Sequence, residues 1–139
     1  MSGTLAICSV PDEVKEKLRD FRFAKSSSMN ALIVKVQKET QEFAVEEEYL
    51  DSNLDEIRDE LPAQQPRFLL LSWCRKHDDG RQSFPLLLVY YCPNGCSPDL
   101  QMLYAGSRNH LIKECDLTKT IELRDLDDLT DEFIVSKLA

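Results

Sequence analysis

Apolar residues recur at spacings of three and four over residues 97–115, SPDLQMLYAGSRNHLIKEC, which is the longest helical pattern in the chain. This period predicts an amphipathic helix of about five turns. Ser97 suits the N-cap because its hydroxyl can accept a bond from an orphan backbone N–H, and Pro98 and Asp99 suit the next two positions. The side expected to face a core carries Leu100, Leu103, Tyr104, Ser107, Leu111 and Cys115.

The opposite side of this helix has few charges for a solvated surface. It carries Met102, Gly106, Asn109 and Lys113, flanked by Ala105, Arg108 and Ile112. Small and apolar groups with a few polar ones are typical of a docking surface. The spacing supports equally well an interpretation in which Met102 and Ile112 lie under a neighbouring loop.

Three shorter helices are predicted over residues 10–25, 53–61 and 129–138. Asn53 and Asp127 are the expected N-caps of the second and third. The residues expected to face inward are Val14, Leu18 and Phe21 in the first helix, Leu54, Ile57 and Leu61 in the second, and Leu129 and Phe133 in the third.

Five apolar segments predict strands. The first two should form one hairpin, and the middle two a longer hairpin with a polar tip at the Asp79-Gly80 turn. In the second strand Phe43, Val45 and Tyr49 alternate with acids, while the third is apolar almost throughout and should be central. The predicted strands cover residues 31–36, 41–50, 67–76, 84–92 and 119–124.

The order of these elements defines the expected fold. The long helix can serve as a crossover, so the fifth strand should join the sheet in parallel. We therefore expect an α/β fold of the α+β type, with a mixed five-stranded sheet sandwiched by helices. A chain of 139 residues is long enough for one full core. We expect a single domain over residues 1–139, with residues 1–9 as a flexible N-terminal segment.

Composition narrows the function classes. Hydrophobic residues make up 42% of the chain and charged residues 30%, as in globular soluble proteins. The net charge of −8, from 25 acids and 17 bases, disfavours a protein that tracks nucleic acid with a basic groove. No apolar run is long enough to span a bilayer, and the start lacks a secretory pattern. The five scattered cysteines are therefore expected to be reduced, cytosolic thiols.

Catalytic and metal-binding patterns are weak. Glu46, Glu47 and Glu48 are consecutive, but neighbours on a strand point to opposite faces, so they should not converge on a metal. Cys92 and Cys96 have no second pair at zinc spacing, which favours a turn over a metal site.

Two further arrangements are weak candidates for catalysis. His77 with Asp78 and Asp79 should lie on an exposed tip, and nothing in the sequence brings Cys74 to His110. We expect a binding module with no cofactor or metal. A thiol or acid–base enzyme using Cys74, Cys92 or His77 is the alternative.

Several segments together resemble the actin-depolymerising-factor homology family, also called ADF/cofilin-like. They are KLRDFRFAK at residues 17–25, ELPAQQPRFLLLSW at 60–73, KHDDGRQSFPL at 76–86, QMLYAGSRNHL at 101–111 and DDLTDEFIVSKL at 127–138. The segments span most of the chain. The resemblance implies a single ADF-homology domain with one long helix before the last strand.

The closest resemblance is to the branch of this family that acts on branched actin networks. It implies a non-enzymatic protein that binds the Arp two/three complex, inhibits branch nucleation and promotes debranching, and that binds actin weakly. The alternative is an actin-binding, filament-severing module of the cofilin type. Severing relatives carry bases where this chain has Asp99 and Gln101, which should weaken attraction to acidic actin.

The resemblance also implies contact residues. The first surface is the outer side of the long helix together with the N-terminal segment, and it is expected to use Met102, Gly106, Arg108, Asn109 and Lys113. The second surface is the hairpin tip with the terminal helix beside it, and it is expected to use Lys76, His77, Asp78, Asp79 and Arg81. Arg19, Arg22 and Lys25 are expected to add a basic patch, and Ser2 is a candidate phosphorylation site.

The resemblance further implies a mechanism and a location. The long helix would act as a wedge in a cleft of an actin-related subunit where the first actin of a daughter filament docks. The second surface would contact a neighbouring subunit or that actin. We expect a monomer in the cytoplasm, at the actin cortex and in branched-network regions such as lamellipodia, with the nucleus as a further location.

Overall fold

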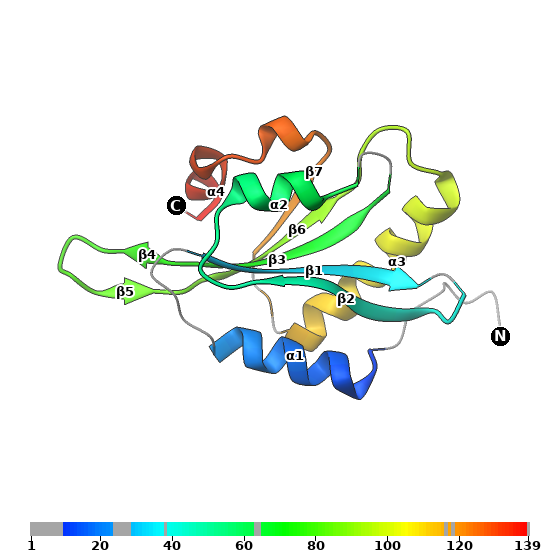
Figure 1. Ribbon diagram of the computed structural model, residues 1–139, viewed down its shortest axis with the longest axis horizontal. Helices are drawn as coiled ribbons and strands as arrows, with labels where there is room; N and C mark the ends of the chain where they lie inside the picture. Colours follow the sequence, from blue (N-terminus) through cyan, green and yellow to red (C-terminus); the bar gives the residue numbers. More distant parts are fainter. Residues whose placement is uncertain are drawn as a thin grey trace.

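A mixed five-stranded sheet lies between two layers of helices (Figure 1). The computed structural model describes residues 10–23, 29–37, 39–62, 65–115, 117 and 119–138. The elements in this part of the chain are α1 Asp12–Phe23, β1 Met29–Gln37, β2 Glu42–Tyr49, α2 Leu54–Glu60, β3 Arg67–Trp73, β4 Arg75–Lys76, β5 Gln82–Ser83, β6 Leu86–Tyr91, α3 Pro98–Cys115, β7 Thr120–Leu123, the 3-10 helix η1 Leu126–Asp128 and α4 Asp131–Leu138.

The order of strands across the sheet is β2-β1-β3-β6-β7. All neighbouring pairs are antiparallel except β6 and β7, which are parallel. The central position of β3 and the parallel β7 confirm the sequence prediction. The 18 residues of α3 provide the crossover that a parallel connection needs.

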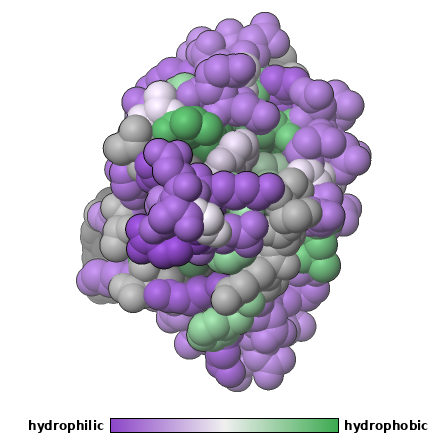
Figure 2. All heavy atoms as spheres, turned by 90° about the vertical axis from the view of Figure 1, so that its left-hand side faces the viewer, coloured by the Kyte–Doolittle hydropathy of each residue, from purple (hydrophilic) through white to green (hydrophobic). Residues whose placement is uncertain are grey.

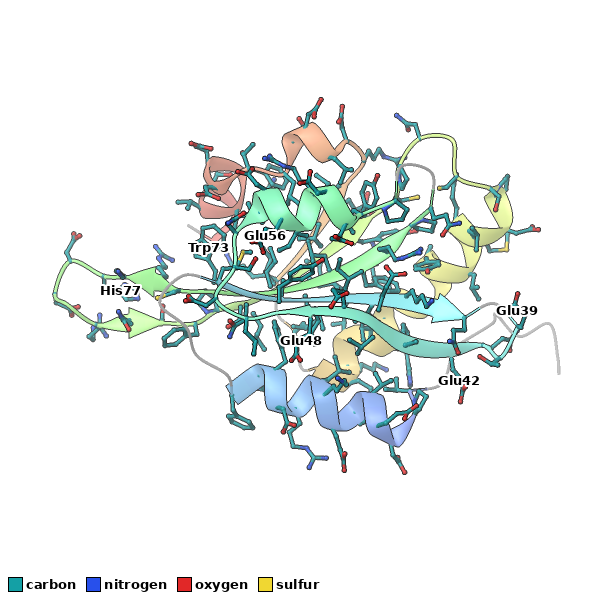
Figure 3. The ribbon with its side chains drawn as sticks, viewed as in Figure 1. Glu39, Glu42, Glu48, Glu56, Trp73 and His77 are labelled. Atoms are coloured by element: carbon teal, nitrogen blue, oxygen red, sulfur yellow. The ribbon has the colours of Figure 1, made fainter. Side chains whose placement is uncertain are left out.

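The long hairpin is interrupted where the sequence predicts continuous strands. β3 ends at Trp73, and the short pair β4–β5 continues the hairpin beyond the sheet. Pro85 lies opposite this break, and its carbonyl accepts a bond from the Trp73 N–H at 3.2 Å. Because proline has no N–H to return, the ladder stops there. Figure 3 shows Trp73 near the base of this projection and His77 further out.

The β1–β2 pairing contains a bulge, and the side chains of β2 beyond it point to the opposite face of the sheet from the one expected for an unbroken strand. Ile33 pairs with Glu47 whereas Val34 pairs with Val45, so Glu46 is an extra residue in β2. Val45 therefore packs on one face of the sheet and Tyr49 on the other. The expectation that Phe43, Val45 and Tyr49 simply alternate was wrong for Tyr49.

Each face of the sheet has its own core. α1 and α3 cover one face through Leu18, Phe21, Tyr104 and Leu111, which pack with the β3 residue Phe68. On the other face Leu54 and Ile57 of α2, Ile134 of α4 and Leu129, which follows η1, are buried. The predicted inward residues Val14, Leu103, Ser107 and Leu61 are also buried, whereas Leu100 and Phe133 are only partly buried.

Two predicted helix starts are confirmed and one is wrong. The Ser97 hydroxyl accepts a bond from the Leu100 N–H at 3.3 Å, and Asn53 Oδ1 accepts one from the Glu56 N–H at 3.1 Å. Asp127 lies within η1 and does not cap α4. Thr130 takes that place, because its hydroxyl accepts a bond from the Phe133 N–H at 3.2 Å.

The four tyrosines should make the fold sensitive to alkaline pH. Burial raises the pKa of Tyr49 to about 12 and also raises the pKa of Tyr90, Tyr91 and Tyr104. Their contribution is fully present below about pH 10, where unfolded tyrosine keeps its proton. Above that pH the unfolded state loses protons that the folded state holds. The free energy of unfolding should then fall by up to about 1.4 kcal/mol per pH unit for each tyrosine.

Urea unfolding between about pH 8 and pH 11 measures this loss. Tyr49→Phe is the control, since the buried Tyr49 hydroxyl has no hydrogen-bond partner among the described residues. This variant should show a shallower alkaline slope. A slope equal to that of the unchanged protein would contradict the role assigned to Tyr49.

Candidate functional site

The outward side of α3 forms a stripe that we call the helix surface, defined by Met102, Gly106, Arg108, Asn109 and Lys113. Met102 has 71% of its surface exposed, and Asn109 and Lys113 are also exposed. Spacings of four, three and four residues place Met102, Gly106, Asn109 and Lys113 in one row along the helix, and Arg108 flanks this row. The interpretation that a loop covers Met102 was wrong. Ile112, by contrast, is half-buried and packs against the core.

Tyr104 holds α3 firmly against the sheet. Its hydroxyl accepts a bond from the Val36 N–H at 2.9 Å, and its ring lies 5.2 Å from the ring of Phe68. The β1–β3 ladder ends at Val34, so this hydroxyl pairs an N–H that β3 does not reach. α3 is therefore fixed on the sheet, and the helix surface is pre-organised.

Arg108 is tied to the edge of the sheet. Its Nη1 donates to Glu122 Oε1 at 3.0 Å, and its guanidinium lies 5.6 Å from the centre of the Tyr90 ring. The pairing with Glu122 was not foreseen from the sequence, because the two residues are on different elements. About a third of the Arg108 side chain is exposed. Of the five predicted contact residues, Arg108 is thus already engaged within the fold.

The hairpin tip is the turn from Lys76 to Arg81. The Gly80 N–H donates to the His77 carbonyl at 3.0 Å, and the His77 N–H donates to the Arg81 carbonyl at 2.8 Å. Gly80 has φ +90°, a left-handed conformation that suits glycine in a three-residue hairpin loop. The tip is therefore a defined turn that projects beyond the sheet.

Charges at the hairpin tip are partly paired. Asp79 accepts bonds from the Arg81 Nε at 2.6 Å and from the Arg81 N–H at 3.0 Å. Lys76 and Asp78 are exposed. The His77 ring shares a hydrogen bond of 2.9 Å with the Ser83 hydroxyl, so this partner is a hydroxyl group rather than an acid. This geometry suits polar recognition better than acid–base chemistry.

The start of α3 and the hairpin lie toward opposite ends of the molecule, whereas the end of α3 lies near the middle, beside α1. In Figure 1 the hairpin extends at the left, while α3 begins at the right. α4 ends on the same side of the molecule as the hairpin. A partner that contacts both surfaces must therefore extend along the sheet or consist of more than one subunit.

The predicted basic patch borders a groove on α1. Arg19 and Arg22 line a groove of about 660 Å³ with Leu18, Leu117 and Glu114. α1 is linked to α3 by the Lys15–Glu114 ion pair at 3.8 Å. Figure 2 views the end with the hairpin and shows hydrophilic side chains over most of it. Lys25 and Ser2 lie outside the described residues, as does the expected N-terminal segment at residues 1–9.

Thiol–imidazole chemistry at Cys74 and His110 is excluded by distance. The His110 ring stacks on Phe43 at 6.2 Å, and Phe43 pairs with Val36 at one end of β1. Cys74 follows Trp73, which pairs with Met29 at the other end. The seven residue-to-residue steps from Met29 to Val36 span roughly 23 Å of strand.

The described residues lack a cluster of metal ligands and a membrane-spanning helix. No group of three or more His, Cys, Asp or Glu in the described part of the chain could hold a metal ion. Among the same residues, no helix has the length and apolar character needed to cross a membrane.

Known proteins resemble this chain over nearly its full length. The family described as cofilin/tropomyosin-type actin-binding protein matches residues 7–139. Human glia maturation factor beta is 44% identical over 138 residues, which cover 99% of this chain and 97% of that protein. Drosophila melanogaster glia maturation factor is 42% identical over 132 residues, covering 95% of this chain and 96% of that protein.

Solved structures give the same relation. The structure of glia maturation factor from Caenorhabditis elegans aligns with a TM-score of 0.86 and 56% identity, covering 99% of both chains. Streptomyces griseoflavus cofilin aligns with a TM-score of 0.79 at 22% identity, covering 95% of this chain and 97% of that one. The second likeness concerns the fold alone.

Proposed function

The chain belongs to the cofilin/tropomyosin-type actin-binding family, as an actin regulator of the glia maturation factor type, and from this premise we propose that its partner is the Arp two/three complex. In this proposal it inhibits branch nucleation and promotes debranching of actin filaments. It acts by binding, without enzymatic activity and without a cofactor. It works as a monomer in the cytoplasm, at the actin cortex and in lamellipodia, and also in the nucleus.

The observation that carries the proposal is the exposed Met102 on a helix fixed by Tyr104. Exposed apolar side chains on a rigid helix suit insertion into a groove of a partner. Around Met102 the helix surface offers a small residue, Gly106, and an amide, Asn109. We propose that this stripe occupies the cleft of an actin-related subunit where the first actin of a daughter filament docks.

The charge at the start of α3 favours this partner over actin. Asp99 and Gln101 are exposed in the first turns of the helix. The Gln101 side chain is oriented by donation of its Nε2 to the Cys96 carbonyl at 3.0 Å. An acid at the rim of the contact repels an acidic partner, and this gives specificity between related proteins.

The separation of the two surfaces suggests how a branch is released. With the start of α3 at one end and the hairpin at the other, one molecule can touch two subunits of an assembly (Figure 1). We propose that the hairpin tip, with α4 beside it, contacts a neighbouring subunit or the first actin of the daughter filament. Binding then shifts the complex from its branch-holding state to its released state, but only to the extent that the protein has a higher affinity for the released state.

A branch-lifetime measurement tests this function. Labelled branches are formed with the purified complex, and their lifetime is recorded with and without the protein. We expect the protein to shorten the lifetime, and we expect Lys76→Glu to reduce this effect severalfold, because it reverses an exposed charge on the tip. Lys17→Glu on α1 is the control, since it makes the same charge change outside both surfaces.

Two outcomes would contradict the proposal at different levels. A branch lifetime unchanged by the unaltered protein would contradict debranching itself. Equal debranching by both lysine variants would leave debranching in place and contradict the assignment of the hairpin tip.

The second candidate function is actin binding with filament severing, as in cofilin-type relatives, which the family description favours. The charge at the start of α3 separates the two functions. Asp99→Lys combined with Gln101→Lys should raise affinity for actin about tenfold, since replacing rim repulsion by attraction is worth about 1–2 kcal/mol. Cosedimentation with filaments measures the change.

The matched control for the charge change at Asp99, measured in the single variant Asp99→Lys, lies on another helix. Asp59 is exposed on α2, so Asp59→Lys alters the net charge as Asp99→Lys does. If Asp59→Lys raised actin affinity as much as Asp99→Lys, the gain would come from net charge and the local argument would be wrong.

A further inference from the structure

Two thiols lie in contact just before α3. The Sγ atoms of Cys92 and Cys96 are 3.4 Å apart, and both residues are free cysteines. They are nearly buried, with 8% and 5% of their surfaces exposed. A disulfide needs its sulfurs about 2.05 Å apart, so the pair is about 1.4 Å from bonding distance.

The turn between the two cysteines can take up this movement. The Cys96 N–H donates to the Pro93 carbonyl at 3.4 Å, and Gly95 adopts φ +93°. Cys92 is fixed to the sheet, because its N–H donates to the Leu123 carbonyl at 2.9 Å. The shift should therefore fall on Cys96 and the turn rather than on β6.

A surface pocket leads to this pair. Cys92 lines a pocket of about 210 Å³ between α3 and β7, together with Tyr90, Gln101 and Leu123. Charged groups in its wall are Arg108, Arg124 and Glu122, of which Arg108 and Glu122 bond to each other. The pocket is large enough for a small oxidant such as a peroxide.

We propose that Cys92 and Cys96 form a reversible oxidation site, in which a peroxide entering this pocket converts the two thiols into an intramolecular disulfide at the start of α3. The Cys92 thiolate attacks one peroxide oxygen, the O–O bond breaks, and the departing hydroxide takes up a proton to give water. The sulfur of Cys96 then attacks the sulfenic sulfur of Cys92. The S–O bond breaks, and the hydroxyl group leaves as water with the Cys96 proton.

The balance of this reaction is complete. Two thiols lose two electrons, and one peroxide becomes two waters. A dithiol reductant reverses the reaction by thiol–disulfide exchange. This chemistry does not depend on the partner proposed above.

The surroundings of Cys92 set the rate of the first step. Burial raises the pKa of the Cys92 thiol, as does the hydrogen bond with Cys96, whereas Tyr90 and Arg124 act in the opposite direction. Arg108 and Glu122 complete the charged groups that line the pocket. Oxidation should be slow at neutral pH and should accelerate about tenfold per pH unit until the thiol ionises.

A movement of Cys96 should displace the start of α3, because Gln101 of this helix is hydrogen-bonded to Cys96. Gln101 Nε2 donates to the Cys96 carbonyl at 3.0 Å, and the Tyr90 hydroxyl donates to the Gln101 carbonyl at 3.4 Å. Met102 follows Gln101 directly. Formation of the disulfide should therefore alter the first turns of α3.

The test treats the full chain with one equivalent of hydrogen peroxide at neutral and mildly alkaline pH. Remaining thiols are alkylated, and the digested protein is mapped by mass spectrometry. We expect a Cys92–Cys96 disulfide with the loss of two hydrogens, faster at the higher pH and reversed by dithiothreitol. Amide hydrogen exchange over residues 97–104 should differ between the reduced and oxidised forms.

Two variants sharpen this test. Cys74→Ser should still form the disulfide, whereas Cys92→Ser should not, and circular dichroism shows whether each variant is folded. Disulfide mapping of the unaltered protein tests the proposed oxidation site even if Cys92→Ser does not fold. Oxidation at Cys74 with Cys92 and Cys96 left as thiols would overturn the proposed site. A disulfide that leaves exchange in α3 unchanged would overturn its link to the helix.

Discussion

Replacing Met102 by Asp is expected to weaken binding to the Arp two/three complex by at least about thirtyfold, which corresponds to the 2 kcal/mol or more of a central contact residue. Met102 has 71% of its surface exposed, so the substitution removes little packing from the fold. In the complex it would place a charge in an apolar cleft, where desolvation is costly. Titration of labelled complex measures the loss of affinity.

Two variants serve as controls for this result. Met102→Leu conserves shape and apolar character, so it should bind within a few fold of the unaltered protein. Leu50→Asp makes a comparable change at a residue with 60% of its surface exposed and outside both surfaces. If Met102→Asp bound as tightly as Leu50→Asp, the helix surface would not be the site.

Replacing Tyr104 by Phe is expected to lower the free energy of unfolding by about 1–3 kcal/mol. The Val36 N–H donates to the Tyr104 hydroxyl at 2.9 Å in a buried position. The change to Phe leaves this N–H without its hydrogen-bond partner. Replacing Tyr104 by Ala should cost about 3–5 kcal/mol, because the ring packed on Phe68 is lost as well. Urea unfolding at neutral pH measures both values.

Tyr91→Phe is the matched control for the hydroxyl. The Tyr91 hydroxyl donates to the Pro62 carbonyl at 2.9 Å in a partly buried position. Water can replace that donor, so we expect a cost below about 1 kcal/mol. Equal effects of Tyr104→Phe and Tyr91→Phe would contradict the view that Tyr104 fixes α3 through Val36.

Helical period and apolar content were enough to predict most of the fold. The alternation of helix and strand patterns gave the sheet, its central β3 and the parallel β7, all of which are present. These features depend on which residues can be buried, and burial leaves a period in the sequence. The same logic identified Tyr104, Ser107 and Leu111 as the inward side of α3.

Local irregularities could not be predicted from the sequence because they depend on pairing between distant segments. The extra residue Glu46 shows only when β2 is placed beside β1. Pro85 ends the ladder at Trp73 because of its place in the opposite strand. At α4, Asp127 and Thr130 are both good N-caps in isolation, and the turn formed by η1 decides between them.

The candidate surfaces were predictable in composition but not in arrangement. The resemblance indicated Met102 and the hairpin tip, and the structure places both on accessible parts of the molecule. The start of α3 and the hairpin lie toward opposite ends because of the direction of α3 across the sheet, which periodicity does not specify (Figure 1). The tie between Arg108 and Glu122 likewise required the folded chain.

The most direct measurement is one binding experiment with two baits, purified actin and the purified Arp two/three complex, at matched salt. We expect retention by the complex with little or no retention by actin. Strong retention by actin would contradict the charge argument from Asp99 and Gln101 and would favour the severing type of function. Retention by neither bait would contradict the proposed partner while leaving the fold assignment unaffected.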